Sequence, residues 1–159
     1  MFFWFVGTAI ATVRFVFRDP RFDYRLLVVG SLLPLVDALF GGARVLHTLV
    51  FSLALLLVVM LATVGRRSRR RLWLGLPIAT LLHLVFDGVW ADTEVFWWPL
   101  SGWAFGDAGL PEAERGWWNV PLELIGVAIL AWVWRTARLR DHARREAALH
   151  TGRLFADVP

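Results

Sequence analysis

Long apolar runs alternate with short polar stretches along the chain. The runs cover residues 2–17, 26–40, 43–64, 72–90 and 119–134. At a rise of about 1.5 Å per residue, a helix over 43–64 would be about 33 Å long and one over 72–90 about 28 Å. Both lengths suit a hydrocarbon core of about 30 Å. The pattern predicts an all-α fold, a polytopic membrane protein with about five transmembrane or re-entrant helices.

The second run differs from the others because it is short and interrupted. A helix over 26–40 would be only about 22 Å long, and the run contains Pro34 and Asp37. Proline in a helix interior removes a hydrogen bond and kinks the axis. We therefore expect this segment either to span with a kink or to dip into the bilayer and return beside Gly41 and Gly42.

Composition supports a membrane environment. Of the 159 residues, 58% are hydrophobic and 19% are charged, which is too apolar for a water-soluble domain of this size. The chain has no cysteine, so disulfides and cysteine-ligated metal sites are excluded. Residues 1–17 have no basic segment at their start and no small-residue cleavage site after them, so we read them as a retained helix rather than a signal peptide.

Arginines predict the orientation. All 17 basic residues are arginine, and they lie in short blocks between apolar runs, which is typical of membrane topology rather than of nucleic-acid binding. If the blocks at 18–25, 66–71 and 135–145 are cytoplasmic, the chain crosses an inner membrane several times with its N-terminus outside and its C-terminus inside. The lipid bilayer is then a partner, nucleic acid is not, and the pattern indicates no oligomeric state.

The long segment at 91–118 is expected outside, and it is rich in tryptophan, which favours membrane interfaces. Its tryptophans could form a lid or a sugar-stacking surface, or simply anchor the chain in the interface. The pattern divides the chain into a helical membrane domain, 1–135, and a basic cytoplasmic tail, 136–159. Part of that tail could form an amphipathic helix on the inner surface.

Four ionisable side chains interrupt the apolar runs, namely Asp37, His47, His83 and Asp87. An aspartate at the centre of a spanning helix costs about 2.5–3.5 kcal/mol, so four such groups need partners. In the predicted topology all four lie towards the outer face, with His47 one turn inside its helix. His83 and Asp87 are four residues apart and therefore share a helix face. Imidazoles and carboxylates are ligands for zinc, manganese and iron, so the sequence predicts a divalent metal site, with zinc preferred.

Three further residues are predicted to act beside the metal. Glu94 and Glu123 are candidate general bases, and Arg44 could hold a substrate phosphate through its planar guanidinium. Each has an alternative role. Glu94 could be a solvated loop acid. Glu123 could ligate the metal, pair with Arg44 or orient a histidine. Arg44 could instead help to orient the chain in the membrane or form an ion pair.

The stretch 30–37, Gly-Ser-Leu-Leu-Pro-Leu-Val-Asp, resembles a glycine- and P-D-x-D-containing motif of the LexA-binding, inner-membrane-associated hydrolases, also called membrane-bound metal-dependent hydrolases. His47-Thr48 resembles the end of that family's H-R-G-x-T-H-S motif. His83 to Asp87, with Trp98-Pro99 following, resembles its H-x-x-x-D and W-P stretch. The resemblance covers about residues 27–100 and implies a helical metal-dependent hydrolase, distantly similar to zinc-dependent phospholipase C and P1 nuclease.

The chain departs from the family pattern at two positions. Leu35 stands where the motif has its first acid, and Gly42 where it has its first histidine. The remaining four ligands suffice for one metal ion. We therefore expect a membrane-bound metal-dependent hydrolase acting on a phosphoester or lipid-linked substrate at the outer leaflet. The alternatives are a non-enzymatic membrane protein with a structural polar or metal cluster and, third, an ion transporter.

Overall fold

The computed structural model describes residues 1–105 and 109–155. These residues form helices and loops without a β-strand, so the all-α prediction is confirmed. The longer helices are α1 (Phe2–Phe17), α2 (Arg25–Leu32), α3 (Leu49–Ala62), α5 (Gly75–Asp87), α8 (Asn119–Thr136) and α9 (His142–Thr151). Short helices connect them: η1 (Leu33–Phe40), η2 (Val45–His47), α4 (Arg67–Trp73), η3 (Val89–Ala91), α6 (Thr93–Phe96), α7 (Pro111–Glu114) and η4 (Gly116–Trp118).

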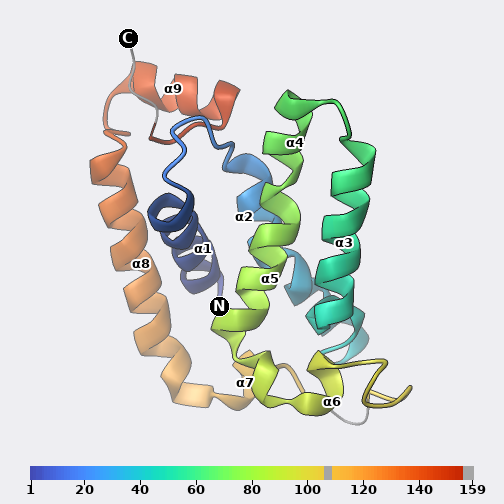
Figure 1. Cartoon of the computed structure of the whole chain (residues 1–159). Helices are drawn as coiled ribbons and strands as arrows, with labels where there is room; N and C mark the ends of the chain where they lie inside the picture. The colour runs from blue at the N-terminus through green and yellow to red at the C-terminus, as the bar shows by residue number, and fades with distance from the viewer. Residues whose placement is uncertain (106–108, 156–159) are drawn as a thin grey trace.

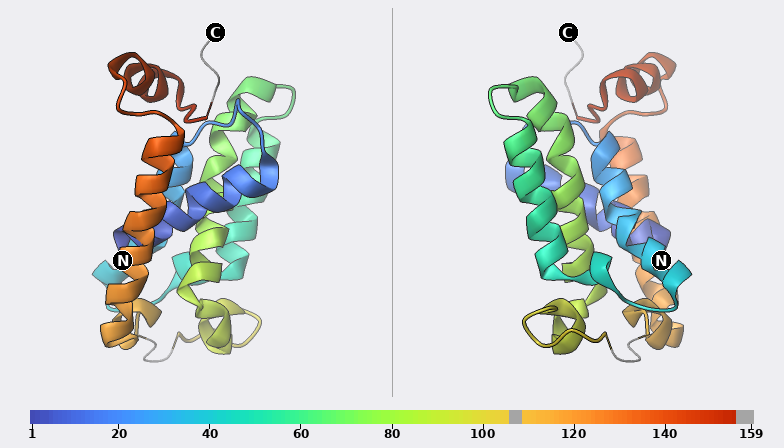
Figure 2. Two further views of the ribbon diagram at one scale, coloured as in Figure 1. Left: turned by 90° about the vertical axis from the view of Figure 1, so that its left-hand side faces the viewer. Right: turned by 90° about the vertical axis from the view of Figure 1, so that its right-hand side faces the viewer.

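The helices form a bundle with two different ends. Helices α3, α5 and α8 run along the bundle, and α1 crosses it obliquely (Figures 1 and 2). The α1–α2 connection, α4 and α9 lie at one end, while α6 and α7 lie at the other. The three arginine-rich blocks therefore share one end, which we call the basic end, and the tryptophan-rich segment lies at the opposite end.

Two helix pairs approach each other closely at glycine. A Cβ on Gly30 of α2 would lie 2.3 Å from the carbonyl oxygen of Leu76 on α5. A Cβ on Gly126 of α8 would lie 2.3 Å from the backbone nitrogen of Trp4 on α1. Small residues at such crossings let helix backbones pack closely, a common device in membrane bundles. The crossing at Gly30 also sets the position of α2 relative to the polar side chains of α5.

Three of the predicted runs fold differently from a single helix. The fourth, 72–90, begins in α4, contains all of α5 and ends in η3. The α-helix of the second run ends at Leu32, and the chain continues as the 3₁₀ helix η1 with Pro34 in its first turn. Proline lacks the N–H that an α-helix would need there. The third run was predicted to be helical from residue 43, which is wrong. Its helix begins at Leu49, because Thr48 is extended and its hydroxyl accepts a hydrogen bond from the Phe51 N–H at 3.0 Å, forming an N-cap.

Two further segments have defined structure, namely the basic segment before α5 and the C-terminal tail. The arginine block at 66–71, predicted only to connect two apolar runs, lies largely within α4, since arginine is a good helix former. In the tail, the Gly152 carbonyl accepts a hydrogen bond from the Tyr24 N–H at 2.8 Å. Leu154 and Phe155 pack against the core formed by α1, α2, α5 and α8.

One helical stretch of the described residues, Gly116–Thr136, is long and apolar enough to cross a membrane. Only 11% of its most apolar 18-residue stretch is buried within the protein. Phe2–Phe17 and Leu49–Ala62 are apolar but shorter; α3, with 14 residues, is about 21 Å long. The structure thus provides one candidate span.

Candidate metal centre

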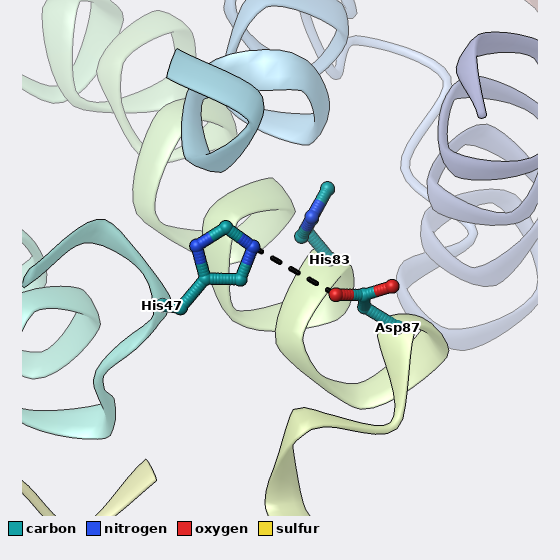
Figure 3. Close-up of side chains that lie close together, drawn as sticks. All are labelled: His47, His83 and Asp87. Atoms are coloured by element: carbon teal, nitrogen blue, oxygen red, sulfur yellow. Dashed lines mark ion pairs between the residues drawn. The ribbon is translucent and has the colours of Figure 1, made fainter. Parts of the chain in front are cut away.

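Three buried side chains converge towards the end of the bundle opposite the basic end. His47, His83 and Asp87 each offer one ligand atom, and these atoms all lie within 4.8 Å of one another. Figure 3 shows the three groups facing a common point, with His47 coming from the chain before α3 and the other two from α5. At most 2% of each residue is exposed. The arrangement brings together three of the four predicted ligands.

The α5 pair owes its position to the way the helix ends. His83 and Asp87 are one turn apart on α5, so their side chains lie on the same face. Asp87 is the last residue of the helix, and Gly88 follows in the left-handed conformation with φ 72°. Glycine adopts this conformation without steric cost. The helix therefore stops where its final side chain reaches the site.

Asp37 lies behind His47 rather than in the group of three. Its Oδ2 lies 2.9 Å from Nδ1 of His47, and it accepts hydrogen bonds from the backbone N–H groups of Arg44 at 2.9 Å and His47 at 3.2 Å. These bonds hold residues 44–47 around the carboxylate. Because a carboxylate accepts and does not donate, Nδ1 of His47 is the donor, and Nε2 carries the free lone pair.

A backbone carbonyl orients the second imidazole in the same way. Nδ1 of His83 lies 2.7 Å from the Ser31 carbonyl oxygen, so this Nδ1 also donates and Nε2 carries the lone pair. The ring of Phe5 lies against the His83 ring, with centroids 3.8 Å apart. The two imidazoles lie 5.5 Å apart and nearly perpendicular, at 76°. Both rings are thus fixed in orientation and tautomer.

Arg115 binds the third member of the group. Its guanidinium donates to Oδ1 of Asp87 and to the Asp87 carbonyl oxygen. The second carboxylate oxygen, Oδ2, lies 3.7 Å from Nε2 of His47. The arginine therefore holds one oxygen of the carboxylate and leaves the other facing the imidazoles.

The hydrogen bonding of the two imidazoles fits a metal. In the described residues, the buried Nε2 atoms of His47 and His83 have no hydrogen-bond partner. Buried polar atoms are nearly always paired, so two such atoms facing each other need an explanation. Metal-bound histidines commonly donate their other ring N–H to a carboxylate or a backbone carbonyl, as these two do. Two imidazoles and one carboxylate form a donor set known from catalytic zinc sites.

The three predicted catalytic residues lie outside this group. The two carboxylate oxygens of Glu123 accept hydrogen bonds from the Phe2 N–H at 2.6 Å and the Trp4 N–H at 3.1 Å. Glu123 thus binds the N-terminus of α1, where a carboxylate is favoured. Glu94 is exposed on α6. The Arg44 guanidinium lies over the Phe105 ring, 5.8 Å from its centroid.

Two residues of the site were not predicted from the sequence. Ser31 acts through its backbone carbonyl, which carries no residue-specific signal. Arg115 lies 28 positions after Asp87 in a segment whose arginine could equally be a surface charge. Its contact with the carboxylate of Asp87 assigns it to the site, and no sequence pattern marks that contact.

Comparisons with known proteins do not identify the chain. No family model, no curated protein and no solved structure matches it.

Proposed function

We propose that this protein is a membrane-bound, metal-dependent hydrolase that acts on phosphoesters, with a single divalent cation held by His47, His83 and Asp87. One observation supports this most: the two imidazoles present Nε2 atoms without a hydrogen bond to each other and to a carboxylate, deep inside the protein. The resemblance of the motifs around these residues to the membrane-bound metal-dependent hydrolases supports the same assignment.

We further propose that the bundle lies in a membrane as a multi-pass protein. Large apolar side chains are exposed on the outward faces of α1, α3 and α8, among them Phe15, Leu57, Leu61 and Leu124, each more than half exposed. Apolar faces of this extent need lipid or another protein to cover them. The arginine blocks share one end, which we assign to the cytoplasm because of the positive-inside preference. The metal site and the exposed tryptophans then lie towards the outer face.

The residues around the site have separable roles in this proposal. When bound, zinc or a similar ion, such as manganese or iron, would acidify a water molecule and polarise a phosphoryl oxygen. Asp37 and the Ser31 carbonyl hold the two imidazoles in the ligating tautomer, and Arg115 holds Asp87. Because both oxygens of Glu123 are engaged by α1, we assign proton acceptance to Glu94. Arg44 would contact the negative charge of the substrate.

A second candidate function is a non-enzymatic membrane protein in which the same residues form a structural polar or metal cluster. The enclosure of the site favours it, because His47, His83 and Asp87 are almost completely buried. A structural site is closed, whereas a catalytic site keeps an open coordination position. The two functions differ in turnover, not in metal binding.

The experiment that tests the proposed function is a phosphoesterase screen of the reconstituted, zinc-loaded protein. Soluble and lipid-linked phosphomonoesters and diesters would be compared in the wild type and in His83→Ala. His142→Ala is the matched control, because His142 is exposed on α9. We expect turnover in the wild type and control and none above background in His83→Ala. Equal rates in all three proteins would contradict the proposal, and metal binding without turnover would favour the structural cluster.

A further inference from the structure

The corner between α8 and α9, at the basic end, contains two adjacent hollows. The first has a volume of about 500 Å³ and lies between α1, α2, α8 and α9. This volume falls within the roughly 300–1,000 Å³ of typical ligand pockets. Its walls are almost entirely apolar, formed by residues such as Ile10, Val28, Leu130, Val133, Ala148 and Leu154.

The second hollow is basic. It has a volume of about 480 Å³ and is lined by Trp134, Arg135, Arg138, Arg140 and Asp141. Trp134 also lines the first hollow, so the two meet at its indole. The only acid here, Asp141, caps α9 by accepting the Ala143 N–H at 2.9 Å. Among the described residues, none of these three arginines forms an ion pair.

The apolar hollow exists because α9 lies across the end of the bundle and is attached at its C-terminal end (Figures 1 and 2). The Gly152 carbonyl accepts from the Tyr24 N–H, and the His150 carbonyl accepts from the Arg25 guanidinium at 3.2 Å. A Cβ on Gly152 would overlap the Asp23 carboxylate, so glycine is required for this attachment. These contacts hold α9 above the apolar side chains without filling the space beneath it.

We propose that the two hollows together bind one anionic phospholipid of the cytoplasmic leaflet. An acyl chain would occupy the apolar hollow, and the phosphate would lie among Arg135, Arg138 and Arg140. This inference rests on the proposed membrane orientation and not on the metal site. Its failure would therefore leave the metal assignment intact.

Charge complementarity determines the choice of occupant. Three guanidinium groups face a single carboxylate that α9 already uses, so the basic hollow favours a net negative headgroup. Basic pockets beside membrane helices on the cytoplasmic side are known to bind anionic headgroups. A choline headgroup would place a quaternary ammonium beside these arginines, which is unfavourable. The site should therefore distinguish phosphatidylglycerol from phosphatidylcholine with the same acyl chains.

Fluorescence quenching at Trp134 tests the proposal. The full chain would be reconstituted in phosphatidylcholine vesicles containing increasing fractions of phosphatidylglycerol brominated on its acyl chains, and the titration repeated with brominated phosphatidylcholine. The Trp134 contribution is the difference between the wild type and Trp134→Phe. We expect this contribution to be quenched at about tenfold lower mole fraction of the anionic lipid than of the zwitterionic lipid.

Three variants make the test specific to this corner. Arg138→Gln/Arg140→Gln should abolish the preference, as should Ala148→Phe, which fills the apolar hollow without removing charge. The matched control is Arg18→Gln/Arg67→Gln, which removes two exposed arginines from the same end; Arg18, like Arg138, has a positive φ. The control should keep the preference. Equal quenching by both lipids in the wild type, retention of the preference in either corner variant, or its equal loss in the control would overturn the proposal.

Discussion

The two ends of the bundle differ in whether their ionisable side chains are buried or exposed. At the end that holds the candidate metal site, four ionisable side chains are at most 3% exposed, and each has a defined partner: Asp37 holds His47, Ser31 holds His83 and Arg115 holds Asp87. At the basic end, arginines such as Arg138 and Arg140 are exposed and need no protein partner. Charge at the exposed end can serve topology or lipid contact, whereas buried ionisable groups require a specific arrangement.

The comparison shows that a functional assignment depends on unmet hydrogen-bonding capacity more than on residue type. The exposed His142 and His150 can exchange bonds with water. His47 and His83 cannot, and each has a buried Nε2 without a hydrogen-bond partner among the described residues. The same residue type therefore carries a functional inference at one end of the molecule and none at the other.

Gly30→Ala should have the largest effect on stability, because its Cβ would lie 2.3 Å from the Leu76 carbonyl oxygen. Overpacking of this kind typically costs about 1–3 kcal/mol, and we expect about 3 kcal/mol because backbone must move. Separating α2 from α5 should also weaken the bond between the Ser31 carbonyl and His83. Thermal unfolding measures the first effect and zinc titration the second. Gly7→Ala, where the nearest contact is 3.0 Å, is the milder control and should bind zinc normally; equal losses in both variants would refute the prediction.

Arg115→Gln should destabilise the metal-free protein by about 1.5–3 kcal/mol, because it removes a charge-assisted hydrogen bond to a buried carboxylate. Zinc should restore part of this loss, since a cation beside Asp87 offsets its charge. The zinc-induced increase in unfolding temperature should therefore be larger in the variant than in the wild type. An identical increase in both proteins would show that Asp87 does not contact the ion.

Asp37→Asn should lower zinc affinity by about 10- to 100-fold, the usual effect of removing the partner of a metal-binding histidine. The asparagine keeps the shape of the side chain but not the charge that orients Nδ1 of His47. Asp92→Asn is the matched control, because Asp92 caps α6 through the Glu94 and Val95 N–H groups and asparagine caps helices equally well. Zinc titrations that give the same affinity for Asp37→Asn and the wild type would argue against the role of Asp37.

Arg138→Gln/Arg140→Gln should change the free energy of unfolding by less than about 0.5 kcal/mol, as is usual for exposed positions, and should leave zinc binding unchanged. Chemical denaturation and zinc titration of the purified variant measure both quantities. A large loss of stability would show that the arginines at the basic end, like the buried groups of the metal site, depend on specific contacts within the protein.

Much of the fold follows from the apolar pattern, but the site follows from it only in part. The run at 2–17 coincides with α1 (Phe2–Phe17), and Pro34 marks a real change of helix type. His47 was expected inside a long α-helix and instead ends the short helix η2, before α3 begins, because the N-cap at Thr48 competes with the helical tendency of the apolar run. The apolar pattern does not predict local hydrogen bonds of this kind.

The residues that hold the predicted ligands could not be predicted from the sequence, for a different reason. His83 and Asp87 share a helix, so their spacing alone predicted their proximity. Asp37 was expected as a ligand, yet it lies behind His47, a distinction set by angstrom-scale placement of one loop. Arg115 contacts Asp87 from 28 positions further along the chain, after a segment whose sequence has no periodic signal. Contacts of this kind depend on tertiary packing rather than on local pattern.

The zinc content of the purified protein shows whether the buried imidazoles hold a metal ion. The wild type, His47→Ala/His83→Ala and the matched control His142→Ala/His150→Ala would be incubated with zinc, freed of excess metal and analysed for zinc per chain. We predict about one ion per chain in the wild type and control and almost none in the buried-site variant, with the helical content of all three unchanged by circular dichroism. Equal zinc in all three proteins would contradict the claim that the buried imidazoles and Asp87 form a metal site.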